Sequence, residues 1–233
     1  MTSAASVPPA IDIFDAAPCA SPGKNGGARV ANGGVTHALA HLHPVDGGAV
    51  DLPAAEQAAS DLLSALGVDL AGESLRDTPG RMARMYAELL TPAPFDPTTF
   101  PNDAGYDELV VVAGIPFHSL CEHHLLPFHG VAHVGYLPGE RIVGLSKLAR
   151  VVDLFARSLQ VQERLTAQIA GWLDEHLQPK GVGVVLEAEH LCMTLRGVQK
   201  AGARTVTSAL HGLVREDSRT RQEFLDLAMR RIG

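Results

Sequence analysis

Four consecutive residues, Cys121-Glu122-His123-His124, place a thiol, a carboxylate and two imidazoles in a loop after a predicted strand. Thiolate and imidazole are ligands that zinc prefers, and two intervening residues let the chain curl around an ion. A second group, His190-Leu191-Cys192, lies at the predicted end of a later strand, where residues two apart project from the same face. Each cysteine of the predicted folded region therefore has a histidine neighbour, and the pattern predicts a metal site.

The histidines at this site are expected to divide between ligation and proton transfer. His123 and His124 are adjacent, and two adjacent residues can rarely bind one ion without strain, so one of them is expected to be free. Cys192 as a ligand likewise leaves His190 close to the metal but not necessarily bound to it. Zinc lowers the pKa of a bound water to about 7, and free imidazoles with a pKa of about 6.5 can move protons. The set therefore predicts hydrolytic chemistry.

Other interpretations of these residues stay open on spacing alone. Cys121 and Cys192 are compatible with ordinary buried core positions, with a closed structural zinc site of four protein ligands, or with a redox-active pair. Counting ligands does not decide between a structural and a catalytic zinc. A cytidine-type deaminase is excluded, because that chemistry needs His-x-Glu with a later Pro-Cys-x-x-Cys, and the sequence has neither.

Anion-binding residues are predicted in two places. Ser146 and Lys147, followed by Arg150, lie at a predicted helix start, where free N–H groups and the helix dipole favour phosphate; the alternative is a solvent-facing capped helix. Arg196 begins a second basic stretch that contains no acidic residue up to Arg204. Glu163 lies in the first turn of another predicted helix. Its carboxylate either complements the helix dipole or accepts two hydrogen bonds from a guanidine-like edge of a substrate.

The elements that position these groups predict an α+β fold, because helices are segregated from antiparallel strands. The first two helices are expected to begin at Asp51 and at Asp77, the second with Pro79 in its first turn. Ser146 is expected to cap a third helical run, and its apolar i, i+4 pattern continues through 161–173. A terminal helix is expected from Asp217. Strands are expected at 108–117, at 131–137 and 141–145 as a hairpin around Pro138-Gly139, and at 182–191 and 205–213 as a final pair.

Length and composition favour one folded domain with an irregular segment at its N-terminal end. In the 233-residue chain, residues 1–50 are rich in Ala, Gly and Pro and are predicted to be a disordered tail without an assigned function. Residues 51–233 are the predicted catalytic domain, with helices in 51–95 and a core in 106–233. The net charge of -7 argues against nucleic-acid binding, and no segment approaches the roughly 20 apolar residues of a membrane span. Three cysteines and no secretory signal favour the cytoplasm.

Several motifs, in order over roughly residues 51–230, resemble the GTP cyclohydrolase I family. They are Asp77-Thr78-Pro79-Gly80-Arg81, Cys121-Glu122-His123-His124, Gly144-Leu145-Ser146-Lys147-Leu148, Val161-Gln162-Glu163-Arg164-Leu165-Thr166, Glu189-His190-Leu191-Cys192-Met193, Arg196-Gly197 and Thr220-Arg221-Gln222-Glu223-Phe224-Leu225. Ala201 departs from the proline expected in that family. The resemblance implies the tunnelling fold, a homodecamer with active sites between subunits, and hydrolysis of GTP to formate and 7,8-dihydroneopterin triphosphate, the first step of tetrahydrofolate or pterin biosynthesis.

The resemblance also implies a role for each motif residue. One Zn²⁺ per subunit would be bound by Cys121, His124 and Cys192, with His123 and His190 carrying protons. GTP would be bound by a larger set: Glu163 on the guanine edge with Gln162 and Ser146 nearby, Lys147, Arg150 and Arg196 on the triphosphate, and Arg81 from a neighbouring subunit. The alternative is a non-catalytic GTP-binding or scaffold relative with a structural zinc.

Overall fold

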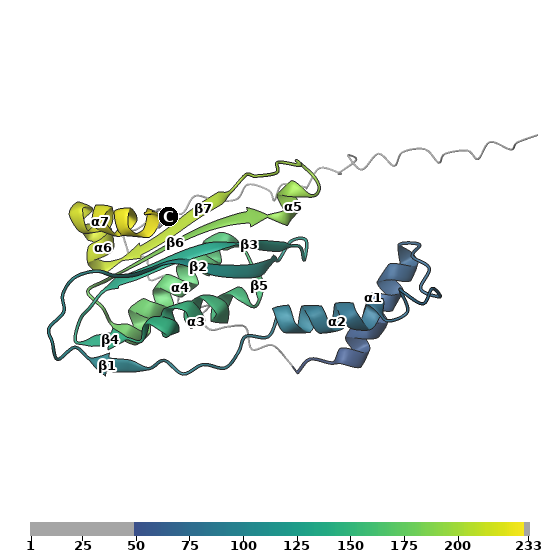
Figure 1. The fold of residues 1–233 in the computed structure, drawn as a ribbon, viewed down its shortest axis with the longest axis horizontal. Helices are drawn as coiled ribbons and strands as arrows, with labels where there is room; N and C mark the ends of the chain where they lie inside the picture. Colours follow the sequence, from purple (N-terminus) through teal and green to yellow (C-terminus); the bar gives the residue numbers. More distant parts are fainter. Residues whose placement is uncertain (1–48, 231–233) are drawn as a thin grey trace, which may run out of the picture. The chain divides into compact units, whose positions relative to one another are not determined.

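The computed structural model describes residues 49–230 (Figure 1). The predicted tail at 1–50 lies outside the described residues except for its last two positions. The described chain begins with two helices, α1 (Leu52–Ala65) and α2 (Thr78–Leu89), as predicted. The Asp51 carboxylate accepts a hydrogen bond from the Ala54 N–H at 3.0 Å and so caps α1. Asp77 stands at the N-cap of α2 but makes no side-chain capping bond there; its carboxylate lies 3.8 Å from the Arg81 guanidinium instead.

The largest sheet within residues 49–230 has five strands in the order β5-β2-β3-β6-β7. Three antiparallel pairings join β2, β3, β6 and β7, and the short β5 pairs with β2 in parallel. The strand bounds are β2 Val110–Cys121, β3 Pro127–Leu137, β5 Leu159–Gln160, β6 Gly181–His190 and β7 Thr205–His211. The final strand pair is therefore confirmed, and β7 forms one edge of the sheet.

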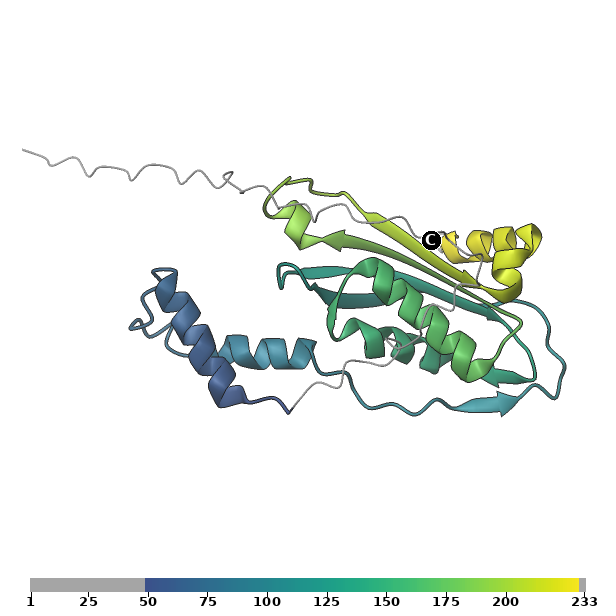
Figure 2. The same cartoon turned by 180° about the vertical axis from the view of Figure 1, so that it is seen from behind.

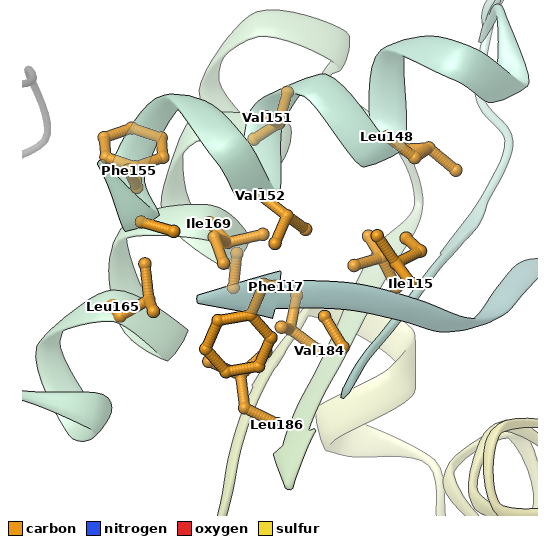
Figure 3. Close-up of a cluster of buried hydrophobic side chains, with 14 of the residues drawn as sticks. Ile115, Phe117, Leu148, Val151, Val152, Phe155, Leu165, Ile169, Val184 and Leu186 are labelled. Carbon is orange, nitrogen blue, oxygen red and sulfur yellow. The ribbon is translucent and has the colours of Figure 1, made fainter. Parts of the chain in front are cut away.

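Two helices, α3 (Leu145–Ala156) and α4 (Gln162–Leu177), cover one face of this sheet (Figures 1 and 2). Their apolar stripes meet alternate residues of the strands, since side chains two apart on a strand share a face. Figure 3 shows this core, in which side chains of α3 and α4 pack against those of β2 and β6. Its labelled members are Ile115, Phe117, Leu148, Val151, Val152, Phe155, Leu165, Ile169, Val184 and Leu186.

The opposite face carries α6 (Gly212–Glu216) and α7 (Ser218–Met229). The predicted start of the terminal helix is confirmed, because the Asp217 carboxylate accepts a hydrogen bond from the Thr220 N–H at 2.7 Å. Phe224 of α7 is completely buried in a smaller apolar cluster with Val185 and Val214. No helix within residues 49–230 combines the length and apolar composition that crossing a bilayer requires.

Three local predictions are wrong. The hairpin around Pro138-Gly139 does not form: β4 (Arg141–Val143) pairs with β1 (Thr99–Pro101), a strand in the Pro-rich connection, in a separate two-stranded sheet. The N-cap of α3 is Gly144, so Ser146 lies inside the first turn and does not cap it. The helical pattern predicted from Ser146 through 161–173 is not one continuous helix, because β5 interrupts it between α3 and α4.

Candidate metal centre

The turn that follows β2 presents Cys121 and His124 together. Cys121 ends the strand, and its carbonyl accepts hydrogen bonds from the N–H groups of His124 (3.3 Å) and Leu125 (2.9 Å). Leu125 adopts a left-handed backbone with φ 54°, which turns the chain back so that the Cys121 N–H donates to Leu126 O at 2.9 Å. One tight turn thus places a thiol and an imidazole on the same side.

Cys192 reaches this turn from β6 by a route that differs from the predicted one. The strand ends at His190, and Leu191–Thr194 form a single helical turn, α5, so Cys192 is not on a strand. Its sulfur nevertheless lies 4.0 Å from Cys121 Sγ, while His124 Nδ1 lies 3.7 Å from Cys121 Sγ. All three ligand atoms lie within 4.8 Å of one another.

These distances fit a metal ion. For tetrahedral zinc with ordinary bond lengths, two sulfurs are separated by about 3.8 Å, and a sulfur and a nitrogen by about 3.6 Å. The two separations from Cys121 Sγ, 3.7 Å to His124 Nδ1 and 4.0 Å to Cys192 Sγ, are close to these values. Burial and the neighbouring Cys121 raise the pKa of the Cys192 thiol, and Arg196 opposes this shift. A bound cation would favour the thiolate of both cysteines.

The two remaining histidines flank the cluster in different settings. The His123 side chain is 64% exposed, with its Nδ1 3.8 Å from Cys121 Sγ. His190 is half-buried and stacks on Phe128 with ring centroids 4.6 Å apart and an interplanar angle of 3°. Burial lowers the pKa of His190, and the nearby Glu163 carboxylate partly offsets this. His190 Nε2 lies 2.8 Å from Gln162 Oε1.

An ion pair that the sequence did not reveal anchors the turn to α4. The Arg164 guanidinium donates to Glu122 Oε2 at 2.5 Å, to Gln160 Oε1 at 2.9 Å and to Leu159 O at 2.8 Å. Glu122 Oε1 also lies 3.8 Å from His123 Nε2. Because charge-assisted hydrogen bonds are stronger than neutral ones, Arg164 holds both β5 and the ligand-bearing turn in place.

The predicted substrate residues fall into three groups. Glu163 and Arg196 act electrostatically on His190 and Cys192 and therefore lie near the metal cluster. Gln162 is buried, and its side chain bonds only to protein groups among the described residues. The other four positions are exposed or bonded elsewhere: Ser146 and Arg150 face solvent, the Lys147 ammonium donates to Asp96 O at 2.6 Å, and Arg81 donates to Ser74 O and Thr78 Oγ1 at 3.0 Å.

Comparison with known proteins places this site in a family. The family model described as GTP cyclohydrolase I matches residues 55–229. The chain belongs to the GTP cyclohydrolase I family. The match begins after the predicted tail and includes every residue of the metal cluster.

Relatives named GTP cyclohydrolase 1 align with most of the chain. The one from Mycobacteroides abscessus is 54% identical over 193 residues, which cover 81% of this chain and 94% of the relative. The one from Aquifex aeolicus is 52% identical over 179 residues, covering 77% and 97%. A solved structure, the apo form of archaeosine synthase QueF-Like, covers 45% of this chain and 94% of that chain at 17% identity with a TM-score of 0.37, too weak a likeness to add to this conclusion. The predicted family and α+β class are confirmed.

Proposed function

We propose that the protein is a zinc-dependent GTP cyclohydrolase I, which hydrolyses GTP to formate and 7,8-dihydroneopterin triphosphate as the first step of tetrahydrofolate or pterin biosynthesis. The observation that carries the proposal is the Cys121, His124 and Cys192 cluster with two further imidazoles beside it. Relatives of this name share more than half of their aligned residues with this chain.

The cluster supplies three protein ligands, which is the number typical of a catalytic zinc site rather than a closed structural one. One Zn²⁺ per subunit, bound there, provides an activated water at neutral pH. His124 would bind the ion through Nδ1, the nitrogen that lies 3.7 Å from Cys121 Sγ, and the two thiols would bind as thiolates. The reduced thiols that this site requires favour the cytoplasm as its compartment.

His123 and His190 are the groups that move protons. His123 is exposed beside the cluster and is free to exchange protons with the substrate and with water. Burial keeps His190 mainly neutral near pH 7, because it lowers the pKa of the imidazole. A neutral imidazole can accept a proton from a reacting group and return it later.

GTP is held by a wider set of residues. Glu163, exposed in the first turn of α4, accepts hydrogen bonds from the guanine edge, and Ser146 and Gln162 complete the set proposed for the base. Arg150 and Arg196 are exposed cations suited to the triphosphate. Lys147 joins them by exchanging its bond to Asp96 O for a phosphate oxygen.

The remaining triphosphate contact, Arg81, is assigned to a neighbouring subunit of a homodecamer. An assembly of this kind is supported by the outer edge of β7, which has no paired strand within the described chain. Apolar side chains exposed on α1 and at its C-cap, among them Leu62 and Leu66, offer a further contact surface. The catalytic domain is 51–233, and residues 1–50 are a tail outside it.

The test is formate release from GTP by the purified, zinc-loaded protein, with the pterin product followed by fluorescence. Formate and pterin should appear together, and a chelated sample should produce neither. Reloading the chelated sample with zinc should restore both products. GTP binding without formate would favour the non-catalytic relative with a structural zinc.

A further inference from the structure

The amide of Gln162 is buried in a fixed orientation. Gln162 is the first residue of α4, and its side chain is fully buried. The amide nitrogen lies 3.1 Å from Leu186 O and 3.0 Å from Thr205 O, on β6 and β7. A backbone carbonyl can only accept, so the NH₂ group must face these two atoms. The amide oxygen therefore faces the opposite way, toward His190.

This orientation determines which nitrogen of His190 carries the proton. His190 Nε2 lies 2.8 Å from Gln162 Oε1, and an amide oxygen can only accept. Nε2 therefore donates, and in the neutral ring Nδ1 is the nitrogen with a free lone pair. Nδ1 has no hydrogen-bond partner within residues 49–230. The stacked Phe128 ring holds the plane of the imidazole.

Two threonines complete the network behind the amide. The Thr166 hydroxyl donates to Gln162 O at 2.7 Å, which uses its proton, so in its 2.6 Å contact with Thr207 Oγ1 it must accept. Thr207 is then the donor in that contact, and its oxygen also accepts from the Gln162 amide nitrogen at 3.1 Å. Each hydroxyl proton in the network has one assignment, and the two protons of the Gln162 amide are shared among Leu186 O, Thr205 O and Thr207 Oγ1. Residues of α4, β6 and β7 therefore set the orientation of the amide together.

We propose that Gln162, supported by Thr207, is a positioning residue for His190 and not a side chain that binds guanine. It keeps the proton on Nε2 and leaves Nδ1 as the nitrogen available to the reacting groups. A guanine that used this amide would have to reach a side chain that is fully buried and already bonded to His190. The consequence for turnover depends on the function proposed above, whereas the tautomer itself does not.

The kinetic test compares variants of the zinc-loaded protein. Gln162→Met, which keeps the length of the side chain and removes both polar groups, should lower kcat for formate release by roughly 10- to 100-fold with little change in the KM for GTP or in zinc content. Thr207→Val should lower kcat by a smaller factor, about 3- to 10-fold. Thr207→Ser keeps the hydroxyl group and should have the kcat of the parent protein. Ser208→Ala removes one hydroxyl from the next position of β7 and should leave kcat unchanged. A raised KM with an unchanged kcat in Gln162→Met would assign the side chain to guanine and overturn the proposal.

The structural test reads the tautomer without GTP. In nitrogen-correlated NMR spectra of protein labelled at histidine, the His190 signals are those missing from His190→Ala. They should show a protonated Nε2 and an unprotonated Nδ1 in the parent protein, and a mixture of both tautomers in Gln162→Met. A proton on Nδ1 in the parent protein would overturn the proposal. If the protein released no formate at all, the proposed function would fail, and the NMR result would still decide how Gln162 acts on His190.

Discussion

At the scale of single residues, surroundings rather than residue type distinguish His124, the proposed metal ligand, from His123, the proposed proton carrier. His124 and His123 both approach Cys121 Sγ, at 3.7 and 3.8 Å. Only His124 also lies close to Cys192 within a compact cluster, while His123 is exposed and near the Glu122 carboxylate. A metal bound by His124 therefore leaves His123 available as a proton carrier.

Substitutions should separate these roles. Cys192→Ala should lose both the bound metal and turnover, because two ligands do not hold zinc tightly. His123→Ala and His190→Ala should keep the metal and lose roughly 10²- to 10⁴-fold in kcat, the range for a general acid or base. Metal analysis of each purified variant beside formate release is the measurement. Zinc loss in His190→Ala would mean that ligand and proton carrier have been exchanged.

The sequence indicated the residues of the metal-compatible cluster but not the residues that orient its neighbours. Cys121, His124 and Cys192 are recognisable because thiols and imidazoles at short spacing are rare outside metal sites. The role of Gln162 depends on two backbone carbonyls that packing of α4 against the sheet brings to its amide. Every residue has such a carbonyl, so residue types along the chain do not indicate which ones an amide will meet.

A histidine outside the catalytic set, His133 on β3, is buried on the α7 side of the sheet. Its Nδ1 accepts a hydrogen bond from the Gly114 N–H at 3.3 Å, where an irregularity in β2 breaks the register with β3. Burial lowers the pKa of His133 below its usual 6.5, and the Glu187 carboxylate and the Ala228 backbone partly offset this. The imidazole is therefore favoured as the neutral form in the folded protein.

This shift makes folding stability dependent on pH. The unfolded chain takes up a proton at His133 at a higher pH than the folded chain, so stability is lost as the pH falls from about 6.5 through the lower folded value. We expect His133→Gln, which can still accept from Gly114, to flatten the fall in Tm between pH 7.5 and 5.5. Thermal unfolding of both proteins across this range measures the difference. Parallel Tm profiles would show that His133 contributes nothing to the pH dependence.

At the scale of elements, periodicity predicted the helices and strands better than their partners. The apolar stripes of α3 (Leu148, Val151, Val152 and Phe155) and α4 (Leu165, Ile169 and Leu173) were predicted correctly, because burial of one helical face leaves a pattern within the element itself. The helices α1 and α2 were also predicted, although Leu62, Leu66 and Met85 of their predicted stripes are exposed. The strand that pairs with β4 was not predicted, because β1 lies far upstream in the sequence. The two strands are joined by contacts such as the hydrogen bond from Arg141 Nε to Thr99 Oγ1 at 2.8 Å. The turn residues Pro138-Gly139 indicate only that the chain changes direction.

Packing of α7 on the sheet depends on a glycine of β6. A Cβ added at Gly183 would lie 2.6–2.7 Å from three ring atoms of the buried Phe224. We expect Gly183→Ala to cost about 1–3 kcal/mol, the usual range for overpacking, and to lower Tm by several degrees. Thermal unfolding is the measurement, and Gly72→Ala, where an added Cβ meets no atom within 4 Å, is the control.

A second substitution tests whether contact with the Phe224 ring causes the loss of stability. Phe224→Leu in the Gly183→Ala background should recover part of the lost Tm, because a smaller side chain relieves the contact. If the Tm losses of Gly183→Ala and Phe224→Leu simply added in the double variant, a clash with the ring would not be the reason for the effect of Gly183→Ala.

At the scale of the whole molecule, the described chain leaves surfaces that a monomer rarely exposes. No residue of α1 is fully buried, and Leu66 is 70% exposed. The edge strand β7 carries Val206, which is 57% exposed. Unprotected edges pair readily with other strands, so β7 is a natural contact between copies of the chain. Active sites completed by a neighbour would then make turnover depend on assembly.

A charge placed on the β7 edge tests whether turnover depends on assembly. Val206→Lys introduces an ammonium group where a second strand would pair, and we expect it to shift the mass measured by light scattering from that of the proposed decamer toward smaller species. Formate release should fall with the assembled fraction if Arg81 of a neighbouring subunit completes the site, as proposed above. Zinc content per chain should stay at one, since Cys121, His124 and Cys192 all lie within one subunit, and this serves as the control for folding. An unchanged mass with full zinc content would mean that subunits meet elsewhere than at β7.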